Sequence, residues 1–217
     1  MGRHNNIFSN GLLKFFSYKE IYGLAQTIKI MAKHVFHVES MYRLEADLQS
    51  NHVVPQSKIP LEIKYFSSEF DIDSWDHRGR IKEIRGDFGV HQFKQRLENG
   101  YILVCAFHNH ELAGFYWGEV DNIADAGYEL GSDYAYGMDC FVFEEYRGNG
   151  IHPVLHHSLQ RYLKEYYPDK KVLVSHVATW NKKSYRGNLY AGCKITRLEY
   201  SLVIMGLHKK FPVKYFA

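Results

Sequence analysis

The sequence has few cysteines and prolines and no long apolar run. No stretch reaches the roughly 18 consecutive apolar residues that a membrane-spanning helix needs, so we expect no membrane span. The three cysteines, Cys105, Cys140 and Cys193, are odd in number, widely spaced and set in apolar stretches, which favours buried, reduced thiols. Residues 1–10 lack the charge, apolar run and small-residue cleavage site of a signal peptide. These absences predict a cytoplasmic protein.

A strong charge of one sign is also missing. The formal net charge is +3, and lysine pairs such as Lys182-Lys183 are scattered rather than gathered in a run that would follow phosphates. We therefore expect no nucleic-acid partner. Histidine is plentiful, at 13 residues, but only His34 and His37 have the i, i+3 spacing of a helical pair, and no set has zinc-site spacing with cysteine. We expect no metal.

What is present is the composition of a globular domain with a full core. Of the 217 residues, 46% are hydrophobic, 24% are charged and 16% are aromatic. Residues 1–60 differ from the rest, because 17–33 have the apolar spacing of an amphipathic helix, 35–44 favour a strand and 51–60 form a connector with two prolines. The helix is expected to pack on the body of the protein or on a second subunit, as in a homodimer, with a membrane surface as the alternative.

Residues 61–178 alternate between strands and polar segments. Strands are predicted over 61–66, 134–143 and 171–178, and a hairpin over 101–107 and 112–120. Residues 67–99 are polar and carry helical patches. The charged residues in this segment suit the recognition of a polar amine, or simply the solvated face of a helix.

The sequence EEYRGNGIHP at 144–153 follows a strand and precedes a strongly amphipathic helix. Gly148 and Gly150 let the backbone turn sharply and bring its N–H groups close to a ligand. At the start of a helix those N–H groups lack intrahelical partners and the helix dipole adds positive charge, which suits phosphate oxygens. The loop is neither a Walker nor a Rossmann motif, so a glycine turn without a ligand stays open.

This loop resembles a motif of the GNAT acyltransferase family, Arg/Gln-x-x-Gly-x-Gly/Ala, and residues 179–195 resemble the family's Asn-x-x-Ser/Ala…Tyr-x-x-x-Gly-Phe segment. The resemblance implies that loop amides bind the pyrophosphate of coenzyme A, that the preceding strand pairs with pantetheine, and that two polar residues face the cofactor arm. The residues that the resemblance assigns to the cofactor are Cys140, Phe141, Val142, Arg147, Gly148, Asn149, Gly150, Ile151, His152, Asn181 and Ser184.

The resemblance also implies a fold and a division of the chain. We expect the α/β fold of GNAT acyl-CoA N-acyltransferases, with a central mixed, mostly antiparallel sheet flanked by helices. Residues 61–217 would form this domain and residues 1–60 a helical N-terminal extension. The implied reaction is direct transfer of an acetyl group from acetyl-CoA to a small polar amine, such as an amino sugar or an amino acid.

Two residues are candidates for catalysis. Tyr190 is assigned to the family's tyrosine beside the thioester sulfur, where its hydroxyl would protonate the leaving thiolate, although an aromatic packed under the last strands is the alternative. Asp139 precedes the loop and would act as general base through water, or would form a hydrogen bond within the sheet. A backbone N–H near Val142 would polarise the carbonyl of the thioester. Cys140 is expected to be a buried residue without a catalytic role.

Departures from the family pattern keep other functions open. His152 stands where glycine or alanine is usual, so its side chain would either clash with a phosphate or contact it as a cation. Pro153 removes one N–H donor, which a first helical turn tolerates. The alternatives are a long-chain N-acyltransferase that uses an acyl-carrier protein, and a non-catalytic module that binds coenzyme A or a partner.

Overall fold

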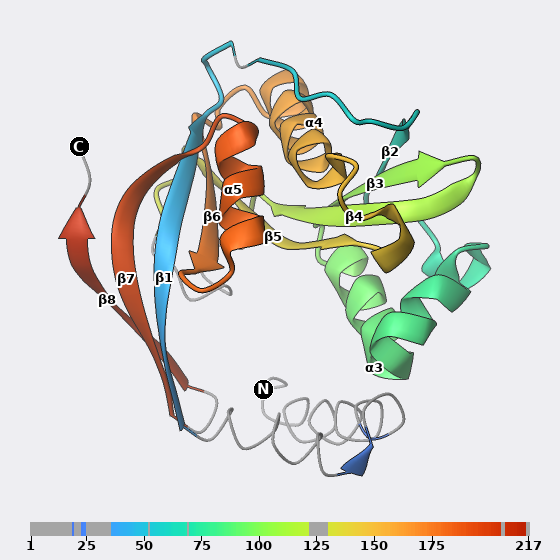
Figure 1. Cartoon of the computed structure of the whole chain (residues 1–217), viewed down its shortest axis with the longest axis horizontal. Coiled ribbons are helices and arrows are strands. Elements are labelled where there is room, and N and C mark those ends of the chain that lie inside the picture. The colour runs from blue at the N-terminus through green and yellow to red at the C-terminus, as the bar shows by residue number, and fades with distance from the viewer. Residues whose placement is uncertain are drawn as a thin grey trace.

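A computed structural model describes residues 19, 23–24, 36–51, 53–68, 70–121, 130–204 and 207–215. The described residues form one eight-stranded sheet with the order β2-β3-β4-β5-β6-β1-β7-β8 (Figure 1). The strands are β1 Phe36–Asp47, β2 Glu62–Phe66, β3 Ile102–His108, β4 Glu111–Glu119, β5 Tyr134–Val142, β6 Val172–Ala178, β7 Lys194–Ile204 and β8 Leu207–Tyr215. The amphipathic helix expected over 17–33 falls outside the described residues, apart from positions 19, 23 and 24.

The sheet is mixed and mostly antiparallel, which confirms the fold expected from the sequence. Only β5 and β6, among the described strands, pair in parallel, and their pairing runs from Tyr134 opposite Val172 to Gly137 opposite Ser175. Beyond this point both strands continue without pairing to each other. The sheet therefore opens between the second half of β5 and the end of β6.

The strand expected over 35–44 is present as β1, Phe36–Asp47. It pairs antiparallel with β6 on one side and with β7 on the other, so it lies inside the sheet (Figure 1). Leu44 and Ala46 of this strand are fully buried in the main core. Residues before position 60 thus contribute a strand to the same sheet as the rest of the chain.

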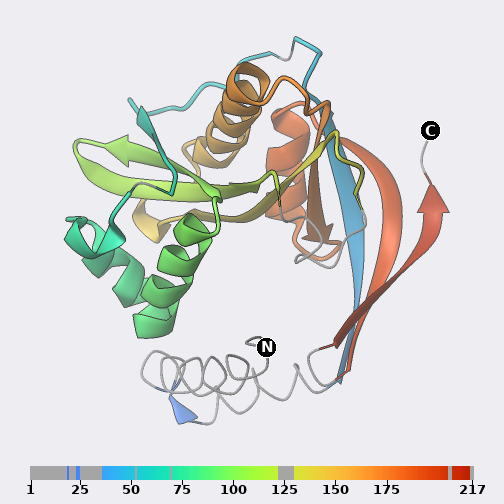
Figure 2. The same ribbon diagram turned by 180° about the vertical axis from the view of Figure 1, so that it is seen from behind.

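Helices cover both faces of the sheet (Figures 1 and 2). On one face lie α4, Ile151–Tyr166, and α5, Lys182–Tyr190. The apolar stripe of α4, with Ile151, Leu155, Leu159 and Leu163, is buried against the strands because its residues recur with helical spacing. None of the described helices is long and apolar enough to cross a membrane.

The opposite face carries α3, Arg78–Glu98, which follows the short 3-10 helix η1, Ile72–Ser74. Phe93 of α3 packs edge-on against Phe115 and Trp117 of β4, at 4.9 Å between ring centroids in each case. At Gly86 the helix is kinked, with φ of 64° and ψ of −171°, values that glycine adopts without a steric penalty.

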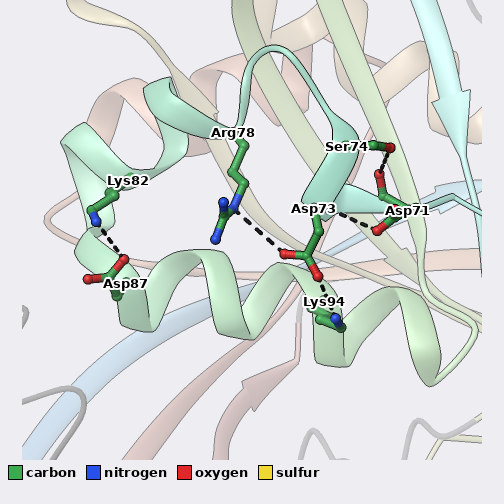
Figure 3. A network of polar contacts seen from close by, with 7 residues as sticks. All are labelled: Asp71, Asp73, Ser74, Arg78, Lys82, Asp87 and Lys94. Atoms are coloured by element: carbon green, nitrogen blue, oxygen red, sulfur yellow. Dashed lines mark hydrogen bonds and ion pairs between the residues drawn. The ribbon is translucent and has the colours of Figure 1, made fainter.

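Surface ion pairs connect the two halves of this kinked helix (Figure 3). The carboxylate of Asp73 contacts Lys94 at 2.5 Å and Arg78 at 3.7 Å, and Lys82 contacts Asp87 at 2.9 Å across the kink. These side chains are about half exposed. These five charged residues therefore pair with one another at the surface.

Candidate functional site

A cleft of about 610 Å³ lies where the sheet opens, between the second half of β5, the start of α4 and the helix α5. It brings together residues from three separate sequence motifs. The sequence-predicted residues that line it are Cys140, Phe141, Val142, Arg147, Gly148, Gly150, Ile151, His152, Asn181, Ser184 and Tyr190. Asn149 and Asp139 do not line it.

The loop before α4 leaves the start of that helix open to the cleft. Gly148 and Gly150 have φ values of 83° and 77°, in the left-handed region that glycine tolerates best. Gly150 is the N-cap residue of α4, and no side chain caps the helix. The first N–H groups of α4 are therefore available to an anion, and the helix dipole reinforces them.

The backbone of β5 beyond the opening also faces the cleft. The N–H of Phe143 donates to the carbonyl of Ala113 in β4, so by strand alternation the N–H and C=O groups of Val142 point to the other edge. In agreement, Arg147 Nε donates to the Val142 carbonyl at 3.2 Å. Val142 thus presents main-chain groups toward the gap between β5 and β6, where an extended ligand could pair with them.

Asn149 shapes the loop from outside the cleft. Its carbonyl accepts hydrogen bonds from the N–H of Lys58 at 2.9 Å and from the hydroxyl of Ser57 at 3.0 Å, and its side-chain amide donates to the carbonyl of Tyr146 at 3.1 Å. The connector before β2 therefore braces the loop. Sequence reasoning assigned Asn149 to the cofactor and could not detect this bracing, because the partners lie about ninety positions earlier.

The imidazole of His152 packs against α5. The side-chain amide of Asn188 lies 3.3 Å from His152 Nε2, and a Cβ atom added at Gly187 would come within 2.8 Å of His152 Nδ1. Burial lowers the pKa of His152 to about 4, so the ring is neutral at neutral pH. His152 therefore forms part of the cleft wall as a neutral group.

Behind the cleft wall, buried hydrogen bonds fix both helices to β6. The hydroxyl of Ser175 donates to Asn188 Oδ1 at 3.2 Å and lies 3.3 Å from His156 Nε2. Gln160 Nε2 lies 2.9 Å from His156 Nδ1 and donates to the carbonyl of Ala191 at 2.8 Å. Burial lowers the pKa of His156 to about 3, which keeps this network neutral and rigid.

Tyr190 is the last residue of α5; it lines the cleft, and the residue is 78% exposed. The Tyr-x-x-x-Gly spacing, counted back from Gly192, reaches Asn188 rather than Tyr190. Asn188 is buried, and its amide also donates to the carbonyl of Ser184 at 2.9 Å. Sequence reasoning missed Asn188, although this spacing pointed to it.

Asp139 lies on the other side of β5, under α3. Where β4 pairs with β5, Tyr116 is opposite two residues, Asp139 and Cys140, so β5 has a β-bulge at this point. Within the bulge, Asp139 has a φ of 53°. Its carboxylate accepts hydrogen bonds from Arg85 at 2.6 and 3.1 Å and from Arg96 at 2.6 Å. Burial alone would raise the pKa of Asp139, but the two guanidinium groups lower it below its ordinary value.

The cleft also contains cations and a thiol. Lys183 and Arg186 of α5 line it together with Arg147, and sequence reasoning did not assign the first two. Three cations around an open helix start favour an anionic ligand.

Burial raises the pKa of the Cys140 thiol well above its ordinary value, which disfavours a thiolate nucleophile. Within the described part of the chain, no three His, Cys, Asp or Glu side chains gather as a metal site would require.

Comparison with known proteins supplies the family. Residues 63–189, more than half of the chain, match the model of the Acetyltransferase (GNAT) family. The fold resembles a tandem GNAT protein from the clavulanic acid biosynthesis pathway, with a TM-score of 0.56 and 17% identity over 80% of this chain and 55% of that chain. It also resembles an acetyltransferase from GNAT family from Colwellia psychrerythraea, with a TM-score of 0.54 and 10% identity over 98% and 75% of the two chains.

The chain thus spans about half the length of the tandem protein. At these identities the two structures are similar in fold alone. The search of curated proteins gives no match.

Proposed function

Because the chain belongs to the GNAT family of acetyltransferases, we propose that it transfers an acetyl group from acetyl-CoA to the amine of a small polar acceptor. One observation carries this proposal. The uncapped start of α4, preceded by two left-handed glycines, faces a cleft of about 610 Å³ at the point where the sheet opens. The cleft combines a phosphate-binding feature with an exposed strand edge, and coenzyme A has both a diphosphate and an extended arm.

Each part of the cofactor has suitable partners in the cleft. The N–H groups of 148–152 would hold the diphosphate, and Pro153 has none to contribute. Lys183 and Arg186 would balance the phosphate charges. The pantetheine arm would pair with residues 140–142 as an added strand, with Asn181, the N-cap residue of α5, and Ser184 of that helix on its other side.

Direct transfer then needs a polarised carbonyl and an acid for the leaving thiolate. The N–H of Val142 points to the gap, where it would donate to the thioester oxygen as charge develops there. The hydroxyl of Tyr190, which lines the cleft, would protonate the sulfur. The high pKa of the Cys140 thiol favours direct attack by the amine over an acetyl-cysteine intermediate.

For Asp139 we propose a positioning role in place of the general base. Both of its oxygens are held by arginines, and its lowered pKa makes it a weak proton acceptor. Its carboxylate would instead hold the bulge of β5 in place, and with it the main chain of the adjacent Cys140.

Calorimetry with acetyl-CoA and a thiol-release assay test the proposal. Acetyl-CoA should bind at micromolar concentration, and thiol should appear with at least one member of a panel of amino sugars, amino acids and polyamines. Binding without turnover across the panel would favour a non-catalytic module. A copurified long-chain acyl group, detected by mass spectrometry, would favour a fatty acyl donor instead.

A further inference from the structure

The side chain of Arg147 lies along the open edge of β5, at the surface of the cleft. Its Nε donates to the Val142 carbonyl at 3.2 Å, and its guanidinium carbon lies 6.0 Å from the centre of the Phe141 ring. Arg147 lines the cleft, and its side chain is 54% exposed. The guanidinium group therefore extends over the last two residues of β5.

This arrangement places Arg147 where the pantetheine arm would pair. The carbonyl of Val142 points to the gap between β5 and β6, where the amide N–H groups of an extended ligand would donate to it as a neighbouring strand does. Arg147 and the arm thus approach the same oxygen from the same side. Pairing along this edge requires the guanidinium group, which also reaches over Phe141, to move away.

A diphosphate in the loop would give this guanidinium group a stronger partner. Arg147 directly precedes Gly148, the first glycine of the loop that would hold the diphosphate, so its flexible side chain can exchange partners by a change of rotamer. A charge-assisted hydrogen bond to phosphate is stronger than one to a neutral carbonyl. The ion pair of Arg147 with Glu144, at 4.0 Å, is exposed and holds the side chain only weakly.

We propose that Arg147 is a specificity-determining residue for the acyl donor: it covers the pantetheine-binding edge of β5 and releases it in exchange for the diphosphate of coenzyme A. The inference rests on the proposed acetyltransferase function. A thioester with a diphosphate supplies the new partner of the guanidinium group, whereas a pantetheine thioester without phosphate has to displace Arg147 without offering a replacement. Arg147 therefore acts against shorter donors as well as in favour of coenzyme A.

The other cations of the cleft are placed differently. Lys183 and Arg186 belong to α5, on the other side of the cleft from the edge of β5. They would attract the phosphates without covering the carbonyl of Val142. Removing one of them should therefore weaken the binding of coenzyme A and give no advantage to a donor that lacks phosphate, which makes Lys183→Ala a matched control.

Binding of acetyl-CoA and of S-acetylpantetheine, which has the arm and the thioester but no phosphate, tests the assignment. Titrations followed in nitrogen–proton correlation spectra measure both Kd values, including weak ones. Arg147→Ala should bind acetyl-CoA about tenfold more weakly, because a charge-assisted contact with phosphate is lost. It should bind S-acetylpantetheine about threefold to tenfold more tightly, because the Val142 carbonyl is no longer covered. The side chain is largely exposed, so the variant should fold.

Inorganic pyrophosphate provides a test that needs no substitution. If it binds the loop and takes over the guanidinium group, wild type should bind S-acetylpantetheine about threefold more tightly in its presence, because the two ligands are coupled through Arg147. Arg147→Ala should show no such coupling. Equal affinity of wild type with and without saturating pyrophosphate would contradict the exchange.

The outcomes separate this inference from the proposed function. Wild-type protein that binds neither acetyl-CoA nor S-acetylpantetheine overturns both. Wild type that binds acetyl-CoA, together with Arg147→Ala that fails to gain affinity for S-acetylpantetheine, overturns the inference alone. A similar gain in Lys183→Ala would attribute the effect to the lost charge rather than to the uncovered strand edge, and would also overturn it.

Discussion

The carboxylate of Asp139 accepts two hydrogen bonds from the guanidinium group of Arg85, at 2.6 and 3.1 Å, across the interface between β5 and α3. Arg85 directly precedes the kink of α3 at Gly86, and Asp139 is the left-handed residue in the bulge of β5. The ion pair therefore connects the kink of α3 to the bulge of β5. It connects the position of α3 to the strand that would hold the thioester.

Replacing Asp139 with asparagine should destabilise the fold. Asparagine tolerates the positive φ, but it leaves the largely buried Arg85 and Arg96 without their counter-charge, a change that costs about 3 kcal/mol. Chemical unfolding at pH 7 measures the difference. Asp87→Asn is the control, because its half-exposed pair with Lys82 contributes about 0–1 kcal/mol.

The same carboxylate predicts how stability depends on pH. The pKa of Asp139 in the folded protein is below the ordinary value of 3.8, so folding favours its ionised form. Its contribution is complete above the unfolded-state pKa and is lost as the pH falls below about 4 and through the folded-state pKa. The difference in unfolding free energy between wild type and Asp139→Asn should shrink over that range, and an unchanged difference at pH 3 would contradict this origin.

The close approach of Gly187 to His152 predicts a compensating pair of variants. In Gly187→Ala the new methyl group meets the imidazole at about 2.8 Å, which should displace the ring into the cleft and weaken acetyl-CoA binding about tenfold. Adding His152→Gly removes the obstructing ring and should restore most of the affinity. Calorimetry measures both; a double variant as weak as the single one would show that the imidazole is not the cause.

Lys183 and Arg186 predict a salt-dependent contribution to cofactor affinity. Replacing both with alanine should raise the Kd for acetyl-CoA at least tenfold at low salt, and by less at high salt, because screening already weakens the interaction there. Lys82→Ala, an exposed lysine on α3, serves as the matched control. If the double variant binds acetyl-CoA at low salt as tightly as wild type, Lys183 and Arg186 do not contribute to cofactor binding.

Tyr190→Phe tests the acid for the leaving thiolate. Loss of the hydroxyl should lower kcat about tenfold to a hundredfold while the Kd for acetyl-CoA stays unchanged, because the ring still lines the cleft. Tyr200→Phe, which changes an exposed tyrosine on β7, is the control. Weaker binding with normal turnover would instead make Tyr190 a cofactor contact.

Local patterns in the sequence predicted the elements around the cleft. The glycines at 148 and 150, the strand before them and the helix after them are adjacent in the chain, so spacing and turn chemistry were sufficient. The expected strand at 35–44 was also found as β1. Its place between β6 and β7 was not predictable, because strand order depends on contacts between segments more than a hundred residues apart.

The partners of individual side chains also could not be predicted from local sequence patterns. Asp139 meets Arg85 and Arg96 from 54 and 43 positions earlier, and nothing at position 139 itself indicates that its carboxylate faces α3. The proximity of His176 and Glu199 depends on β1 lying between their strands. Such pairs become visible once the sheet order is known.

The central claim is that main-chain N–H groups at the start of α4 bind the diphosphate of acetyl-CoA. A nitrogen–proton correlation spectrum recorded during addition of acetyl-CoA tests it most directly. The amide signals of Gly148, Gly150, Ile151 and His152 should show the largest shifts, followed by that of Val142 on the strand. Saturating acetyl-CoA that leaves these five signals in place, or that shifts a different set of residues, would contradict it.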